Sequence, residues 1–227
     1  MIPDQLLQDV VSINLGSVGS VAIFAGIAVT TGASPNIYGD VVVVAAVTTG
    51  ASANIYGDVA AGAAVTTGAS ANFYGDVAGA ALTRGAAAVI HGDFEPTTVR
   101  AIATWEDFHI AYAFEGTQTR DCPLTDGAFL QSGVYAYSGD LSIPADAIIT
   151  IIGDATDTFI FQVTGAVAIG AKVVFNLEAK GDGLPTHSNV VWAIDGTLTA
   201  GAEAKLQGVF LINAAATLVS LACTAGF

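Results

Sequence analysis

The sequence AAVTTGASANIYGDVA at residues 45–60 returns as AAVTTGASANFYGDVA at residues 63–78, with one substitution. An earlier copy, IAVTTGASPNIYGDVV, occupies residues 27–42, and a degenerate copy, AALTRGAAAVIHGDF, occupies residues 80–94. Tandem repeats of this length are typical of solenoids, in which each repeat forms one coil that stacks on its neighbours. The repeat therefore decides the fold class, which is mainly β.

The repeat length of 18 residues contains a finer period of six. A small or apolar residue recurs at every sixth position: Val29, Pro35, Val41, Val47, Ala53, Val59, Val65, Ala71 and Val77. This spacing predicts three short strands per coil, each with an inward side chain, and hence a triangular β-solenoid. An α-helix would need apolar spacings of three and four, which this stretch lacks.

Alternation along each strand predicts which side chains point outward. In one coil Val47 and Thr49 face the core, whereas Thr48 faces solvent. Because stacked strands lie about 4.8 Å apart, equivalent outward residues form ladders. We expect a threonine ladder (Thr30, Thr48, Thr66, Thr83), an asparagine ladder (Asn36, Asn54, Asn72) and a ring ladder (Tyr38, Tyr56, Tyr74, His91). The Gly-Asp pairs beginning at Gly39, Gly57, Gly75 and Gly92 fit corners, where glycine allows positive φ and aspartate bonds its own backbone.

The regular coils, about 27–94, are followed by a different pattern. Pro96 and the threonines after it predict a helix start, and the apolar spacing predicts one long α-helix over about 97–116, packed alongside the solenoid. Residues 133–227 are again strand-like and glycine-punctuated, which indicates less regular coils of the same solenoid. We therefore expect a single domain spanning 1–227.

The composition of the chain argues against several classes of binding partner. The chain has 227 residues, with 6 Lys+Arg against 20 Asp+Glu and a net charge of −14. Such a surface repels phosphate, so we expect no nucleic-acid partner, and it disfavours an anionic membrane face. The apolar runs are too short for membrane insertion. No signal-peptide pattern follows Met1, so we expect that, if the protein is exported, this chain is its mature or an engineered form.

Signals for catalysis or cofactors are weak, and we predict no enzyme, no cofactor and no metal site. His91 continues the ring ladder, His109 falls in the expected helix, and His187 lies in a loop without metal-ligand spacing. The corner aspartates offer one carboxylate each, whereas calcium takes six to eight oxygens, so turn capping is favoured. Cys122 and Cys223 could form one disulfide or be two thiols.

The threonine ladder is the most unusual feature. The neighbouring outward positions are small: Ala28, Ala46, Ala64 and Ala81. Strand propensity alone explains threonine here, but it would equally allow charged residues, which soluble proteins normally place on such a face. A flat, uncharged lattice of methyl and hydroxyl groups at sheet spacing can order water into an ice-like layer.

The chain also resembles the β-solenoid ice-binding (antifreeze) proteins of cold-adapted microbes. The resemblance rests on INLGSVGSVAIFAGIAVTTG (13–32), on residues 132–177 around Phe159-Ile160-Phe161-Gln162, and on NVVWAIDGTLTAGAEAKLQGVFLINAAATL (189–218). It implies a right-handed β-helix of triangular section, one helix alongside, a flat ice-binding face, and a stacking in which N-terminal and C-terminal coils meet.

The family's ice-face pattern adds Ser142, Thr197, Thr199 and Thr217 to the candidate residues, while Gly165-Ala166-Val167-Ala168 lacks hydroxyls. The expected partner is thus an ice crystal surface, bound by a secreted monomer that inhibits ice growth or recrystallisation. Two alternatives remain open. One is a structural or adhesive solenoid, such as a bactofilin-like polymer, and the other is a hexapeptide-repeat acyltransferase with His91 or His187 as base.

Overall fold

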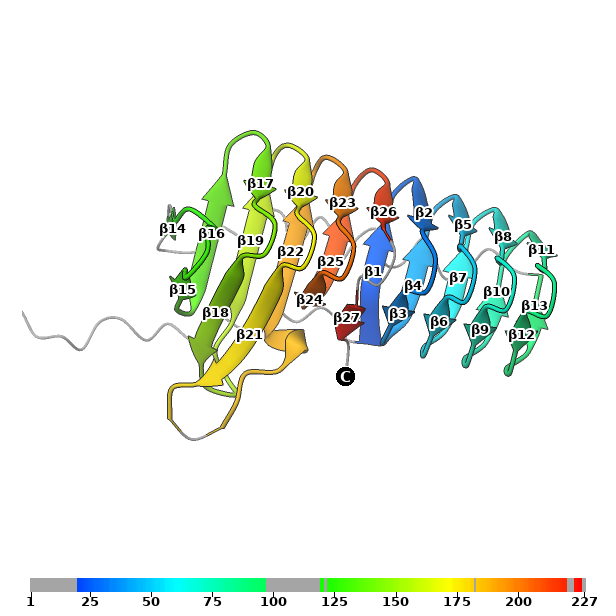
Figure 1. Cartoon of the computed structure of the whole chain (residues 1–227), viewed down its shortest axis with the longest axis horizontal. Helices are drawn as coiled ribbons and strands as arrows, with labels where there is room; N and C mark the ends of the chain where they lie inside the picture. Colours follow the sequence, from blue (N-terminus) through cyan, green and yellow to red (C-terminus); the bar gives the residue numbers. More distant parts are fainter. Residues whose placement is uncertain (1–19, 97–118, 121, 182, 220–222, 226–227) are drawn as a thin grey trace, which may run out of the picture.

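The computed structural model describes residues 20–96, 119–120, 122–181, 183–219 and 223–225. These residues form a long stack of coils, with the strands of successive coils lying side by side along the axis (Figure 1). The strands belong to three sheets, of ten, eight and nine strands, and every pairing between them is parallel. The solenoid predicted from the repeat is confirmed.

Each complete coil contributes one strand to each sheet in turn. Sheet A contains β1 (Val21–Ala25), β4 (Asp40–Val43), β7 (Val59–Ala61), β10 (Val77–Ala78), β13 (Phe94–Glu95), β14 (Thr119–Arg120), β16 (Gly133–Tyr137), β19 (Phe159–Val163), β22 (Val190–Ile194) and β25 (Val209–Ile212). Sheet B contains β2 (Ala28–Thr31), β5 (Ala46–Thr48), β8 (Ala64–Thr66), β11 (Ala81–Thr83), β17 (Leu141–Ile143), β20 (Val167–Ile169), β23 (Leu198–Ala200) and β26 (Ala216–Leu218). Sheet C contains β3 (Asn36–Ile37), β6 (Asn54–Ile55), β9 (Asn72–Phe73), β12 (Val89–Ile90), β15 (Phe129–Leu130), β18 (Ile148–Gly153), β21 (Val174–Ala179), β24 (Lys205–Gln207) and β27 (Cys223–Ala225). Strands β13, β14 and β15 belong to incomplete coils at the two ends.

The order of coils along the axis differs from their order in the sequence. The first coil sits in the middle of the stack, where β1 pairs with β25, β2 with β26 and β3 with β27. In Figure 1 the blue first coil accordingly lies beside the orange and red strands of the C-terminal coils. The meeting of N-terminal and C-terminal coils, which the family resemblance implied, is confirmed.

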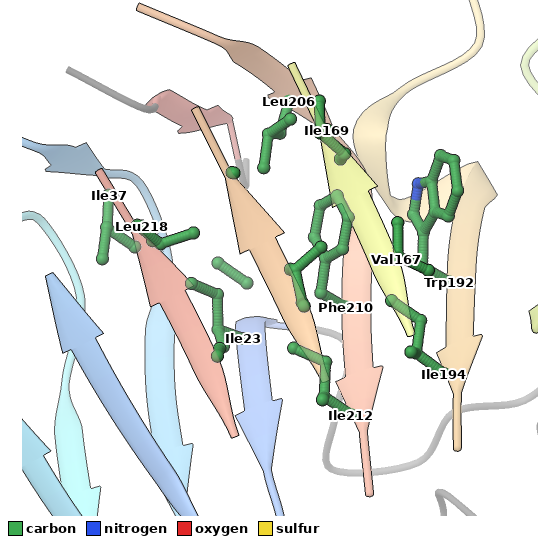
Figure 2. Packing of buried hydrophobic residues seen from close by; sticks show 14 of the residues in the cluster. Ile23, Ile37, Val167, Ile169, Trp192, Ile194, Leu206, Phe210, Ile212 and Leu218 are labelled. Carbon is green, nitrogen blue, oxygen red and sulfur yellow. The ribbon is translucent and has the colours of Figure 1, made fainter. Parts of the chain in front are cut away.

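The core changes width along the axis because the coils differ in length. The short coils fill their interior with small residues such as Val47, Ala53 and Val65, all fully buried. The longer C-terminal coils instead stack aromatic rings, with the centroids of Phe161 and Trp192 4.0 Å apart. Figure 2 shows Trp192 and Phe210 in this part of the core, with aliphatic side chains around them. Such close packing makes the scaffold rigid.

The corners between sheets B and C require special backbone geometry. A non-glycine residue with positive φ stands at this corner in seven coils: Ser34, Ser52, Ser70, Ala87, Asp146, Lys172 and Glu203, with φ between 56° and 61°. The glycines of the Gly-Asp pairs stand at a different corner, between sheets C and A, and have a different role. A Cβ on Gly57 would lie 2.4 Å from the backbone of Gly39 in the preceding coil. Of the four Gly-Asp pairs, only Gly39 has a positive φ, at 110°, so close stacking explains the others.

The fold-class prediction needs one correction. The described residues contain strands and one 3-10 turn, η2 (His187–Asn189), but no α-helix, so the prediction of a solenoid with a long α-helix is wrong for the described chain. The predicted helical segment, 97–116, lies outside the described residues, as does His109. Elsewhere the apolar residues follow the two-residue period of strands, which is incompatible with a helical apolar face. Among the described residues, no helix is long and apolar enough to cross a membrane.

Much of the outer surface of sheet A is not open to solvent, although Glu95 on its edge strand β13 is exposed. Its outward side chains form a second apolar cluster, buried like the core itself: Val21, Phe24, Val42, Ala60, Val191, Val209 and Leu211. Sheet A is thus apolar on both faces, as is usual for covered parallel sheets. Sheets B and C therefore carry the exposed broad faces of the solenoid.

Candidate functional site

One column of small side chains runs the whole length of sheet B, from β17 to β11. Strand pairing places its eight residues directly opposite one another in the order Ser142, Ala168, Thr199, Thr217, Thr30, Thr48, Thr66 and Thr83. All eight point away from the core, and all but the half-buried Thr66 are exposed. Seven of the eight strands thus present a hydroxyl group at the equivalent position, and adjacent strands lie about 4.8 Å apart.

A second outward column lies two residues earlier on each strand. Register pairs Ala28 with Ala46 and Ala64 with Ala81. In the other four coils the equivalent positions, just before the strand, are Asp140, Ala166, Thr197 and Ala215. Six of these eight are alanines, so the surface beside the hydroxyl column is low and apolar. Asp140 is the single charge in the two columns and stands at one end of the sheet.

All twelve site residues predicted from the sequence lie in these two columns of sheet B. The prediction missed four further members, namely Asp140, Ala166, Ala168 and Ala215. Each occupies a position where neighbouring coils carry the predicted residues, so aligning the coils by strand register would have found them. Ala168 is the one member of the main column without a hydroxyl group.

The backbone beneath the threonine column is held by hydrogen bonds between coils. In three of the regular coils the outward threonine is followed by a buried threonine, Thr31, Thr49 or Thr67, whose Oγ1 accepts the N–H of a glycine in the next coil. Gly50 donates to Thr31 at 3.2 Å, and Gly68 donates to Thr49 at 3.3 Å. Thr31 and Thr49 are buried, so these bonds satisfy polar groups inside the scaffold. The outward side chains are therefore mounted on a fixed backbone.

Sheet C is regular too, but its chemistry differs. Its asparagine ladder is confirmed, since the Nδ2 of Asn54 donates to Oδ1 of Asn36 at 2.9 Å, and Asn72 donates likewise to Asn54 at 3.1 Å. Farther along the axis its outward side chains include Lys205 and Glu178, both exposed. Sheet C therefore lacks the uniform, uncharged surface of sheet B.

The corner aspartates cap the backbone rather than gather around an ion. Oδ1 of Asp40 accepts the N–H of Asp58 at 2.9 Å, and Oδ1 of Asp58 accepts that of Asp76 at 2.9 Å. Each of these carboxylates thus accepts a hydrogen bond from the backbone of the next coil. The predicted bond to the aspartate's own backbone is not the one that forms. The described residues contain no group of three or more metal-ligating side chains.

The histidines and the cysteine stand apart from sheet B. His91 stacks on Tyr74 with a centroid distance of 4.8 Å and ends the ring ladder, as the repeat predicted. His187 is half-buried in η2, and burial lowers the pKa of its imidazole below 6.5. Cys122 is a half-buried free thiol.

Comparison with known proteins agrees with this geometry. The model of the ice-binding-like family matches residues 23–226, almost the whole chain. The chain belongs to the ice-binding-like family. Its sequence relatives include an ice-binding protein of Flammulina populicola, 34% identical over 132 residues, which cover 55% of this chain and 49% of that protein. Ice-binding protein K1-A of Typhula ishikariensis is 35% identical over 91 residues, covering 39% and 34% of the two chains. The chain thus spans about half or less of these relatives' length.

Solved structures of ice-binding proteins share the fold. The protein from the ascomycete Antarctomyces psychrotrophicus superposes with a TM-score of 0.60 at 20% identity, covering 95% of this chain and 98% of the other. An ice-binding protein from an Arctic yeast gives a TM-score of 0.60 at 18% identity, covering 95% and 94%. At these identities the likeness concerns the solenoid fold.

Proposed function

We propose that this chain binds ice through the outer face of sheet B and so inhibits ice growth or recrystallisation. The observation that carries the proposal is the single register of the hydroxyl column, from Ser142 at one end to Thr83 at the other. It is supported by membership of the ice-binding-like family. The twelve residues predicted from the sequence, with Ala166, Ala168 and Ala215, form the proposed contact surface.

The rigidity of the scaffold allows side chains that each interact weakly with ice to bind its surface together. Each threonine is fixed by its strand, so the entropy of ordering the side chains is lost on folding rather than at the ice surface. Each methyl group that leaves liquid water contributes about 0.8 kcal/mol. Hydroxyl groups at sheet spacing can join the water layer without displacing it. The alanine column beside them leaves room for ordered water in the shallow trough.

Because the hydroxyl column is long, its many small free-energy contributions add up, and release of the protein from ice is slow. Seven hydroxyl-bearing positions belong to one rigid body, so once a few engage, the others are already in place. Detachment then requires all of them to separate together. A monomer suffices for this mechanism, because one chain presents the complete face. We place its action outside the cell, where it would meet extracellular ice.

Filament formation, the main structural alternative, is opposed by the end coil at residues 80–96. Where the other short coils carry an inward threonine, this coil carries Arg84, which is exposed. Its edge strand β13 ends in the exposed Glu95. Charges on edge strands disfavour pairing with another chain. The end coil therefore favours a stack that terminates.

Thermal hysteresis, the gap between melting and freezing temperatures, tests the proposal with a matched pair of variants. Thr48→Tyr places a bulky ring in the middle of the sheet B face, and we expect it to remove most of the activity. Tyr56→Ala, in the same coil but on the other exposed side, should leave activity nearly unchanged. Circular dichroism should show the strand content retained in both. Equal loss from both variants, or full activity in Thr48→Tyr, would contradict the proposal.

A further inference from the structure

The ring ladder forms a second regular surface that ice binding does not use. The rings of Tyr38, Tyr56, Tyr74 and His91 lie nearly parallel, with centroid distances of 4.5, 4.7 and 4.8 Å and interplanar angles of 3–4°. The first and last rings are thus about 14 Å apart. Because the rings stack face to face, they present a row of edges to solvent along the solenoid axis.

Two other ladders flank this row of ring edges. The asparagine ladder lies two residues before the rings, and the aspartates Asp40, Asp58, Asp76 and Asp93 lie two residues after them. The strip of surface between the ring ladder and the aspartates is therefore bordered on one side by aromatic rings and on the other by aspartate residues.

The exposed part of this strip lies toward the end coil. Tyr74 is 45% exposed, and His91, Asp76 and Asp93 are exposed as well. The carboxylates are held in place, since Oδ1 of Asp76 accepts the N–H of Asp93 at 2.9 Å. The chain's net charge of −14 adds a favourable potential for cations over this surface.

We propose that the ring ladder and the adjoining aspartate ladder form a binding site for elongated, planar aromatic cations. The ligand lies lengthwise along this strip, with the face of its rings against the tyrosine edges, an arrangement that aromatic pairs favour. Its positive charge lies near the carboxylates of Asp76 and Asp93. A ladder about 14 Å long accommodates a ligand of two linked ring systems.

This site is distinct from the proposed ice-binding face. The ring ladder follows the strands of sheet C, whereas the threonine column lies on sheet B. The two surfaces are separated by the corner at Ser34, Ser52, Ser70 and Ala87. Occupancy of one surface therefore leaves the other open, and either proposal can fail without the other.

Thioflavin T is a suitable probe because it is an elongated aromatic cation that becomes fluorescent when its two ring systems are held rigid. We expect saturable fluorescence enhancement with the intact chain at low salt. Tyr74→Ala removes the most exposed tyrosine ring of the ladder and should weaken the affinity about five- to tenfold. The double variant Asp76→Asn/Asp93→Asn keeps a side-chain oxygen for backbone capping but removes two charges. It should weaken binding and reduce its salt dependence.

Thr48→Ala is the matched control, since it removes an exposed group from sheet B and should leave the dye affinity unchanged. The proposal is overturned if Tyr74→Ala binds as tightly as the parent chain, or if Thr48→Ala loses the dye. Equal affinity for an uncharged dye with the same ring systems would also overturn it, because the aspartates would then have no part in recognition. Circular dichroism confirms that each variant retains its strands.

Discussion

Thr30 and Thr217 lie directly opposite each other on adjacent strands of sheet B, although they come from opposite parts of the chain. Thr30 begins the regular repeats, and Thr217 belongs to the final coil of the C-terminal array. Their pairing joins two shorter threonine runs into one column. The same junction pairs Ile23 with Phe210 in sheet A, so the continuity of the surface depends on core packing beneath it.

Ala168 interrupts the hydroxyl column between Ser142 and Thr199. Ala168→Thr adds the missing hydroxyl and methyl groups at an exposed strand position where threonine is favoured. We expect a modest increase in thermal hysteresis, about 1.5- to threefold at equal protein concentration, because one more methyl group leaves liquid water. Ala179→Thr, on an exposed strand of sheet C, is the control and should change nothing. An unchanged activity in Ala168→Thr would show that ice contact does not reach this coil.

The repeat predicted much of this arrangement from the sequence. It placed Thr48 outward and Thr49 inward, and it aligned Asn54 under Asn72 and Tyr56 under Tyr74. Each of these relations depends only on strand alternation and an 18-residue period, which are local properties. The structure confirms them through burial and pairing.

The sequence pattern could not predict which strands from distant parts of the chain lie side by side. Nothing in the residues themselves sets Thr30 beside Thr217 rather than at a free end, and only the family resemblance implied that junction. The bond from Asp58 to the next coil was likewise missed, because an Asx turn and an inter-coil cap require the same residue. Glycine at position 57 was assigned to positive φ, whereas close stacking on Gly39 is the cause.

Gly50 and Ser52 occupy the same corner but should respond in opposite directions to substitution. A Cβ on Gly50 would lie 2.3 Å from the carbonyl oxygen of Gly32, so Gly50→Ala forces two coils apart. We expect a loss of about 1–3 kcal/mol in the free energy of unfolding. Ser52 has a φ of 56°, which favours glycine, and Ser52→Gly should be neutral or stabilising by up to about 1 kcal/mol. Urea denaturation measures both; a Gly50→Ala chain as stable as the parent would rule out close stacking.

Asp58 tests the capping role of the corner aspartates. Asp58→Ala leaves the N–H of Asp76 without its acceptor, and we expect a loss of about 1 kcal/mol in unfolding free energy. Asp58→Asn retains an acceptor oxygen and should lose less. Added calcium should stabilise neither variant nor parent, since capping needs no ion. Calcium-dependent protection of the parent alone would instead indicate a metal role for this ladder.

His187 should make the stability of the chain fall in mild acid. Burial lowers the pKa of its imidazole, so the folded state binds a proton less readily than the unfolded state. As pH falls below about 6.5, the unfolded chain is protonated first, and stability is lost until the pH passes the lower folded pKa. His187→Gln removes this contribution, so its Tm should decline less than that of the parent between pH 7 and pH 5. Parallel declines of the two Tm values would contradict the prediction.

Direct adsorption to ice is the measurement closest to the central claim. A single ice crystal is grown slowly in a solution of the fluorescently labelled chain, beside the double variant Thr30→Tyr/Thr217→Tyr, which obstructs the junction at the centre of the column. We predict that the parent chain is taken into the ice and that the double variant, folded by circular dichroism, stays in the liquid. If the double variant enters the ice as readily as the parent, sheet B is not the surface that binds it.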